Sequence, residues 1–200
     1  MLYKIGRALC VLLGRILYRV EVAGGENVPA GGGYILAANH RSNFDPIFLA
    51  VGVRTQIFYM AKQELFEKNA FLGWLLRALG AFPVERGKGD AGALDRAREI
   101  VRRRGVLGMF IEGTRSKTGA LGRPKSGTAM IAQQTGAGVL PCAIRFEGKL
   151  GWRTHVTIRY GELIPNEALG FTGGELSPHE MKAASHRIMG EIAALLEVGE

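Results

Sequence analysis

The sequence predicts an α/β domain with a mostly parallel or mixed central sheet flanked by helices, plus an N-terminal amphipathic helix. Short apolar segments alternate along the chain with segments of helical periodicity, which is typical of a layered α/β domain. Several of these segments are apolar at consecutive positions, as in strands covered on both faces. The 200 residues suit one such domain, so we divide the chain into a helical segment, 1–24, and a main domain, 25–200.

The first twenty residues have the pattern of an amphipathic helix, with one apolar arc of about 140°. The apolar residues of that arc are Leu2, Ile5, Leu9, Leu12, Leu13, Ile16, Leu17 and Val20. The opposite side carries Lys4, Arg7, Arg15 and Arg19, and the arginines interrupt any longer apolar stretch. Two interpretations stay open: a helix lying on an anionic membrane surface, or a helix packed on the core of its own domain.

The main domain then reads as alternating strands and helices. The expected strands are 34–38, 56–61, 81–84, 106–111, 138–144 and 155–160. The expected helices are 46–51, 71–79, 91–104, 127–135 and 178–197. The last helix is preceded by Ser177 and has Pro178 at its first position and Glu180 at its third, which is a capping box.

The charged residues, cysteines and histidines of the chain indicate which partners, compartment and metals to expect. The 26 Lys and Arg against 18 Asp and Glu give a net charge of +8, which suits an acidic partner. No basic run with interleaved aromatic residues and no zinc-finger spacing is present, so we expect no nucleic-acid partner. Cys10 and Cys142 lie far apart and suit a reducing compartment. The histidines at 155, 179 and 186 lack metal-ligand spacing, so we expect no metal site.

The segment Asn39-His40-Arg41-Ser42-Asn43-Phe44-Asp45-Pro46 follows a predicted strand and precedes a predicted helix. One interpretation is a helix start, capped by Asn43 or Asp45 with Pro46 at the first position. The other is a His40–Asp45 dyad, in which the carboxylate orients the imidazole as a general base. An alcohol nucleophile needs such a base near neutral pH. The two interpretations are compatible, because a carboxylate has two oxygens.

Two further segments end predicted strands with charged residues and glycine. Gly80-Ala81-Phe82-Pro83-Val84-Glu85-Arg86-Gly87 delivers Arg86 into a glycine-rich turn, where a guanidinium suits a phosphate. Phe110-Ile111-Glu112-Gly113-Thr114-Arg115-Ser116 ends at the side of the sheet where α/β proteins place ligands. Taken alone, each is also compatible with an ordinary surface turn.

A competing pattern is Gly87-Lys88-Gly89-Asp90-Ala91-Gly92, which matches the G-x-G-x-x-G of dinucleotide-binding proteins and has Glu112 about twenty residues further on. It predicts an NAD-dependent or flavin-dependent oxidoreductase. Three glycines in six positions arise easily in a chain with 29 glycines. This interpretation also gives no role to His40 and Asp45.

Four segments in this order, N-H-R-S-N-F-D-P, G-A-F-P-V-E-R-G, F-I-E-G-T-R-S and V-L-P-C-A-I, resemble the glycerolipid acyltransferase family, above all its bacterial lysophosphatidate acyltransferases. The resemblance implies transfer of an acyl chain from acyl-CoA or acyl carrier protein to the free sn-2 hydroxyl of 1-acylglycerol 3-phosphate, giving phosphatidic acid without a further cofactor. Other acceptors in the family are glycerol 3-phosphate and lyso-aminolipids. A catalytically silent lipid-binding relative would not need the His40–Asp45 pair.

The resemblance also assigns roles to residues. His40 would be the general base and Asp45 its partner, while Arg86, Glu112, Gly113, Thr114 and Arg115 would serve the acceptor site. We expect backbone N–H groups at the start of the helix after Asp45 to hold the oxyanion. Because both substrates are amphiphiles, the N-terminal helix, together with residues 71–76, would dock the enzyme peripherally on the cytoplasmic face of the cell membrane.

Overall fold

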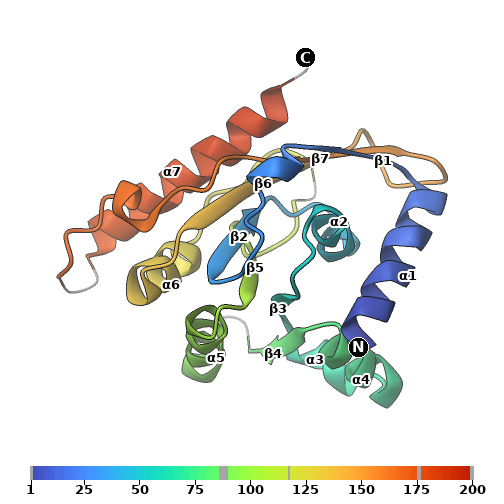
Figure 1. The fold of residues 1–200 in the computed structure, drawn as a ribbon, viewed down its shortest axis with the longest axis horizontal. Coiled ribbons are helices and arrows are strands. Elements are labelled where there is room, and N and C mark those ends of the chain that lie inside the picture. Colours follow the sequence, from blue (N-terminus) through green and yellow to red (C-terminus); the bar gives the residue numbers. More distant parts are fainter. Residues whose placement is uncertain (1, 86–89, 117, 175–176, 199–200) are drawn as a thin grey trace.

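The computed structural model describes residues 2–85, 90–116, 118–174 and 177–198. A seven-stranded sheet with the order β1-β7-β6-β2-β5-β3-β4 forms its centre (Figure 1). The strands are β1 (Arg19–Ala23), β2 (Tyr34–Ala38), β3 (Ile57–Lys62), β4 (Ala81–Val84), β5 (Val106–Phe110), β6 (Val139–Arg145) and β7 (His155–Tyr160). The helices are α1 (Leu2–Leu17), α2 (Asp45–Gly52), α3 (Gln63–Glu67), α4 (Ala70–Ala78), α5 (Ala91–Arg102), α6 (Gly127–Thr135) and α7 (Pro178–Glu197), with short 3-10 turns η1 (Gly25–Asn27) and η2 (Asn166–Leu169).

The sheet is mixed, as predicted. Neighbouring strands pair in parallel, except that β6 and β7 are antiparallel. Strands β1 and β7 therefore run opposite to the others. The remaining strands, β2 to β6, all end at one side of the sheet, which we call its carboxyl end. This shared direction brings the ends of β2, β4 and β5 to the same side.

Helices cover both faces of the sheet, with α2 and α1 on one face and α5, α6 and α7 on the other (Figure 1). Strand β2 is buried along its whole length, and its alternate side chains enter two separate cores. Ile35 and Ala37 pack in the core under α5, α6 and α7. Tyr34, Leu36 and Ala38 pack in the core under α2. Burial on both faces explains why this segment is apolar at consecutive positions.

The N-terminal segment differs from the prediction. The helix was expected to continue to Val20, but α1 ends at Leu17, and Arg19–Ala23 forms β1, which pairs in parallel with β7. The segment 1–24 therefore contains a strand of the central sheet as well as the helix. Val20 fits the apolar arc of the helix and also the alternation of a strand, so the periodicity alone did not separate the two structures. The short helix α3 was also not predicted.

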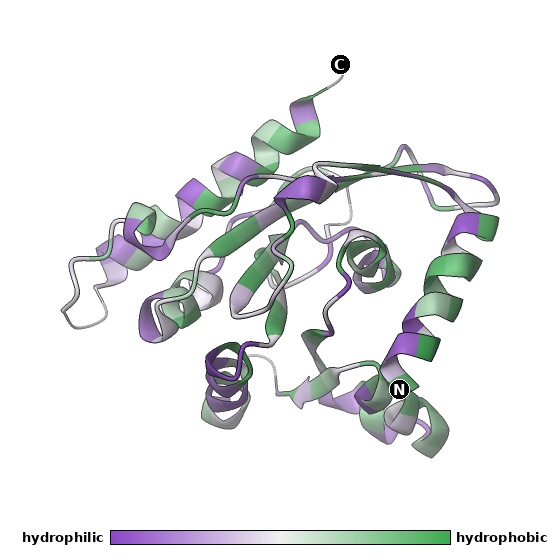
Figure 2. Ribbon diagram, viewed as in Figure 1, coloured by the Kyte–Doolittle hydropathy of each residue, from purple (hydrophilic) through white to green (hydrophobic). Residues whose placement is uncertain are grey.

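Helix α1 turns its apolar residues away from the domain. Its large exposed side chains, 38–58% accessible, are Leu2, Ile5, Leu9, Leu12, Leu13, Ile16 and Leu17. The opposite side contacts the domain, where Arg7 donates from Nε to the carbonyl oxygen of Val53 at 2.9 Å and from Nη2 to that of Val51 at 3.1 Å. Gly14 is buried on this side. Figure 2 shows α1 as a largely hydrophobic helix at the outside of the molecule. The interpretation that its apolar arc packs on the domain's own core is therefore wrong.

Candidate functional site

The carboxyl end of the sheet brings two of the sequence motifs into contact. Strands β2 and β5 are parallel neighbours, and Ala38 at the end of β2 is in register with Phe110 at the end of β5. The residues that follow the two strands, His40 and Glu112, are consequently neighbours. The backbone N–H of His40 donates to Glu112 Oε1 at 2.9 Å. Topology thus places the two motifs together, although 72 residues separate these two side chains.

His40 and Asp45 form the predicted dyad. His40 Nδ1 lies 2.7 Å from Asp45 Oδ2, and the exposed fractions of the two side chains are 11% and 0%. The imidazole thus keeps a small accessible surface, whereas the carboxylate is enclosed. Among the residues that the structure describes, no hydrogen-bond partner is found for His40 Nε2.

The neighbours of Asp45 determine which nitrogen of His40 carries the proton. Asp45 Oδ2 also accepts from the backbone N–H groups of Arg41 at 2.6 Å and Ser42 at 2.8 Å. Because peptide N–H groups only donate, these contacts require Oδ2 to be an acceptor. The Nδ1 of a neutral His40 is therefore the donor to Asp45, which leaves Nε2 with a free lone pair. That arrangement suits a general base.

The start of α2 differs from the expected cap. Phe44, not Asn43 or Asp45, is the N-cap residue, and Asp45 is the first helical residue. The Asp45 carboxylate folds back toward residues 40–42 instead of capping the N–H groups ahead of it. Its position in the first turn favours negative charge through the helix dipole.

The expected oxyanion site at the start of α2 is not supported. The backbone N–H of Asp45 donates to the carbonyl oxygen of Ser42 at 3.3 Å. The N–H groups of Ile47 and Phe48 both donate to the carbonyl oxygen of Phe44, at 2.9 and 3.1 Å. Pro46 has no N–H group. The first turn of α2 therefore holds its N–H groups in internal hydrogen bonds.

Both carboxylate oxygens of Glu112 accept hydrogen bonds from backbone N–H groups. Besides the N–H of His40 on Oε1, the N–H of Gly122 donates to Oε2 at 2.8 Å. Glu112 is 5% exposed. A buried carboxylate with both oxygens bonded to peptide groups repels a phosphate and has no donor to offer it. Through these two hydrogen bonds, Glu112 joins the His40 loop to the loop around Gly122.

The remaining predicted acceptor-site residues lie on the loop after Glu112. Gly113 adopts a left-handed conformation with φ of 72°, which explains the glycine at this position. Thr114 and Arg115 are exposed, and Ser116 donates its backbone N–H to the carbonyl oxygen of His40 at 2.8 Å. Arg86 lies outside the described residues.

Sequence reasoning missed several residues that hold the site. Asn39 is buried, donates from Nδ2 to the carbonyl oxygen of Ile144 at 3.0 Å, and accepts from the Ile144 N–H at 2.8 Å. Its amide thus continues the pairing of β2 with β6 past the end of the strand. Arg41 donates to the carbonyl oxygen of Phe146 and lies over its ring, 4.1 Å from the centroid. Burial lowers the pKa of Arg41, an effect that Asp45 partly offsets. In the sequence, only its place as a polar residue at the end of a predicted strand marks Asn39.

The dinucleotide interpretation finds no support at Glu112. That interpretation needs an exposed carboxylate for a ribose hydroxyl, whereas both oxygens of Glu112 are bonded to peptide N–H groups. Residues 87–89 of the glycine pattern lie outside the described residues. Asp90 instead caps α5, with its Oδ1 accepting from the N–H of Ala93 at 3.0 Å.

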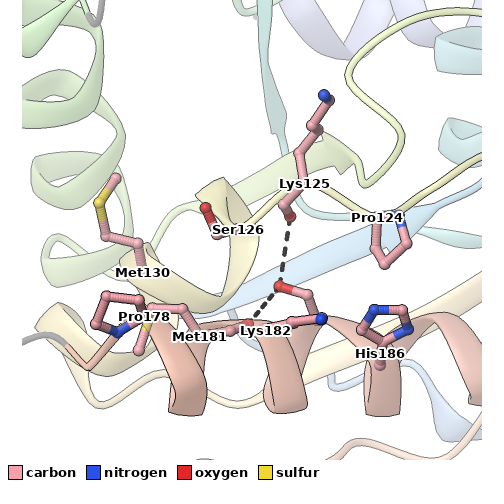
Figure 3. A pocket seen from close by; sticks show the side chains of 9 residues that line it. Pro124, Lys125, Ser126, Met130, Pro178, Met181, Lys182 and His186 are labelled. Atoms are coloured by element: carbon pink, nitrogen blue, oxygen red, sulfur yellow. Dashed lines mark hydrogen bonds between the residues drawn. The ribbon is translucent and has the colours of Figure 1, made fainter.

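A separate cavity of about 480 Å³ lies between α6 and α7 (Figure 3). It is lined by Pro124, Lys125, Ser126, Met130, Pro178, Met181, Lys182, Ser185 and His186. None of these belongs to the dyad or to residues 112–115. Lys125 contributes its backbone, whose carbonyl oxygen accepts from the Ser185 hydroxyl at 3.5 Å, while its side chain points away from α7. This cavity is therefore not the dyad site.

Comparison with known proteins agrees with the geometry of the dyad. The sequence model of the Acyltransferase family matches residues 19–145. The chain belongs to this family. The matched region contains the dyad and the Glu112–Arg115 segment, so both belong to the acyltransferase core of the chain.

Individual relatives carry more specific names. The 1-acyl-sn-glycerol-3-phosphate acyltransferase of Bacillus subtilis is 35% identical over 125 residues, which are 62% of this acyltransferase chain and 61% of the relative. The protein of that name from Streptococcus pneumoniae is 34% identical over 111 residues, 54% of this chain and 40% of the relative. The chain thus spans less than two thirds of either relative. The crystal structure of the 1-acyl-sn-glycerophosphate acyltransferase PlsC from Thermotoga maritima superimposes with a TM-score of 0.72 at 26% identity, over 97% of this chain and 78% of that one.

Proposed function

We propose that this acyltransferase moves an acyl chain from a thioester donor to the free sn-2 hydroxyl of 1-acylglycerol 3-phosphate, giving phosphatidic acid. The observation that carries the proposal is the 2.7 Å contact between His40 Nδ1 and Asp45 Oδ2 at the carboxyl end of the sheet. The names of the relatives in Bacillus subtilis and Streptococcus pneumoniae support the choice of acceptor.

The proposed reaction needs one base and no covalent enzyme intermediate. His40 Nε2 takes the proton from the acceptor hydroxyl while that oxygen attacks the thioester carbonyl. The tetrahedral intermediate collapses, the C–S bond breaks, and the leaving thiolate receives the proton from the imidazolium. Asp45 keeps the imidazole in the required tautomer and stabilises its positive charge during this cycle.

We assign binding of the acceptor phosphate to basic residues on the loops that follow β4 and β5. Arg115 is exposed beside Thr114 on the loop after Glu112, and Arg86 follows β4 in the sequence. Guanidinium groups bind phosphate oxygens in pairs, which orients the acceptor as well as attracting it. The donor is acyl-CoA or acyl carrier protein, and a net charge of +8 suits the anionic groups of both.

A panel of acceptors tests the proposal. Purified protein receives labelled acyl-CoA or acyl carrier protein with lysophosphatidate, glycerol 3-phosphate or a lyso-aminolipid. We expect transfer to lysophosphatidate, and a decrease of about 10²–10⁴-fold in kcat for His40→Ala. His179→Ala, which changes an exposed histidine on α7, is the matched control and should keep full activity. Preference for another acceptor, or an active His40→Ala protein, would contradict the proposal.

We also propose that α1 and α4 hold the enzyme on an anionic membrane surface at the cytoplasmic face of the cell membrane. Besides the exposed leucines and isoleucines of α1, Phe71 and Trp74 of α4 are 69% and 52% exposed, with their ring centroids 5.9 Å apart. An apolar helix face with nearby basic residues is typical of interfacial binding. Among the described helices, none is both long and apolar enough to cross a membrane. Flotation with anionic vesicles measures this docking.

A further inference from the structure

We propose that Phe110, supported by Tyr59, is a positioning residue that fixes the plane of the His40 imidazole for proton transfer. The inference rests on the proposed function for its kinetic consequence, because it concerns the same dyad. It assigns a task to two aromatic residues that neither donate nor accept a proton in the reaction.

Three aromatic rings lie nearly parallel at the carboxyl end of the sheet. The centroids of His40 and Phe110 are 3.9 Å apart with an interplanar angle of 13°, so the phenyl ring covers one face of the imidazole. The Phe110 and Tyr59 centroids are 6.2 Å apart, again at 13°. The rings come from the loop after β2, the end of β5 and the middle of β3.

A glycine on β5 makes room for this stack. Gly108 is in register with Tyr59 on the neighbouring strand β3. A Cβ at position 108 would lie 2.2 Å from Tyr59 Cε1, much closer than two carbon atoms can approach. The absence of a side chain at 108 therefore lets the Tyr59 ring lie across β5. Any larger residue would have to move the ring.

The stack is tied to both members of the dyad. At one end, Phe110 covers His40. At the other end, the buried Tyr59 hydroxyl donates to the carbonyl oxygen of Pro46 at 3.1 Å, and Pro46 directly follows Asp45. Burial raises the pKa of Tyr59 well above its usual value, so the hydroxyl remains a donor throughout the neutral range.

Asp45 alone does not fix the imidazole. A single hydrogen bond to Nδ1 sets one direction but allows the ring to tilt about the line joining Nδ1 and Oδ2. The face of Phe110 opposes that tilt, which would otherwise carry Nε2 away from the acceptor hydroxyl. Small errors in the placement of a catalytic group reduce the rate strongly, by about 10²-fold for 1 Å.

The test combines kinetics with a direct measurement on His40. Phe110→Leu keeps an apolar side chain but removes the ring, whereas Phe110→Tyr keeps the ring. Met109→Leu, at the adjacent half-buried position of β5, is the matched control. Each protein is assayed for kcat and KM with lysophosphatidate, and ¹H–¹³C spectra of histidine-labelled protein record the ring-current shift that a stacked phenyl imposes on the His40 protons.

We expect Phe110→Leu to lower kcat about 10- to 100-fold with KM changed less than about threefold, while Phe110→Tyr and Met109→Leu stay near wild type. The His40 proton signals should lose their upfield shift in Phe110→Leu only. In a His40→Ala background, Phe110→Leu should cause no further loss, because no imidazole remains to be positioned.

Unchanged kcat in Phe110→Leu, unchanged His40 signals, or an equal loss in the His40→Ala background would overturn the proposal. If Phe110→Leu does not fold, Tyr59→Phe and Gly108→Ala decide the question with the same two measurements, since each disturbs the support of the Phe110 ring. Absence of acyl transfer by the wild-type protein would contradict the proposed function instead. The His40 signals would still report whether the stack exists.

Discussion

At the carboxyl end of the sheet, polar side chains are buried and hydrogen-bonded, whereas on the outer side of α1 and α4 apolar side chains are exposed. Glu112 has a backbone donor on each oxygen, and Asp45 holds three donors on one oxygen. On α1, by contrast, Leu9 and Leu13 are 55% and 47% exposed while Arg7 faces the domain. Both regions depart from the usual rule of apolar residues inside and polar residues outside.

The two regions are unusual for different reasons. A buried charge that several N–H groups stabilise is retained because its position serves chemistry, and removing a partner is costly. An exposed apolar stripe adds little to the stability of the monomer, so a partner surface explains it better. Mutations at the first region should therefore affect turnover and folding, and mutations at the second should affect binding alone.

The largest effect is expected for Asp45→Asn. The amide oxygen can take the place of Oδ2 and accept from the same three donors, His40 Nδ1 and the N–H groups of Arg41 and Ser42. The amide carries no negative charge, so it no longer stabilises the imidazolium that forms when His40 takes the proton. We expect kcat to fall by about 10²–10⁴-fold with the fold retained, as measured by steady-state assays and circular dichroism. Near-normal turnover in a folded Asp45→Asn protein would contradict the assignment.

The next effect is expected for Glu112→Ala, which leaves the N–H groups of His40 and Gly122 without their acceptor. An unsatisfied buried donor such as the His40 N–H costs about 1–3 kcal/mol, whereas Gly122 is exposed and its N–H can bond to water. The free energy of unfolding should therefore fall by about 1–3 kcal/mol together with kcat. Urea denaturation and the acyl-transfer assay measure the two changes. Glu162→Ala, at an exposed acid after β7, is the control. A stable Glu112→Ala protein that had lost only affinity for the acceptor would favour direct contact with the phosphate.

At the second region, the double substitution Leu9→Glu/Leu13→Glu should weaken binding to anionic vesicles by tenfold or more, because it places charge in the membrane-facing stripe. Its free energy of unfolding should change by only about 0.5 kcal/mol, as for other exposed sites. Point substitutions are preferable to removing residues 1–22, since that deletion would also remove most of β1. Val198→Glu adds charge at another exposed apolar position, outside α1 and α4, and should leave flotation unchanged. Equal loss of binding in both proteins would refute docking by α1.

The smallest effect is expected for Arg7→Met, which keeps the length of the side chain but removes its hydrogen bonds to the carbonyl oxygens of Val51 and Val53. We expect the free energy of unfolding to fall by about 1–2 kcal/mol while kcat measured with detergent-dispersed lysophosphatidate stays unchanged. Chemical denaturation detects the first change. A loss of kcat without loss of stability would indicate that α1 takes part in the reaction.

Much of the fold could be predicted because its signals are local. The predicted strands 34–38, 81–84 and 155–160 and the helices 127–135 and 178–197 coincide with the structure. Continuous apolar runs, capping residues and glycines at helix ends mark these elements in the sequence. Strand β1 was missed because it depends on pairing with β7, which lies more than a hundred residues further along the chain.

The chemistry of the candidate site was predictable from the sequence, but the contacts that hold its residues in place were not. A histidine five residues before an aspartate, between a strand and a helix, was enough to predict the 2.7 Å contact of the dyad. Three features were not predictable: the direction of the Asp45 carboxylate, the absence of free N–H groups at the start of α2, and the backbone hydrogen bonds to both oxygens of Glu112. Each depends on where a loop folds back, and side chains from other strands determine that path.

The sequence by itself determined the α/β class, most element positions and the pair of residues that perform the proposed chemistry, because periodicity, capping and residue type act over a few positions. Only the tertiary structure decided that the apolar face of α1 points outward, that Glu112 holds the His40 loop, and that Phe110 and Tyr59 stack behind His40. The last two features arise where β2, β5 and β3 lie side by side. Contacts between distant segments depend on strand order and register, which no local pattern encodes.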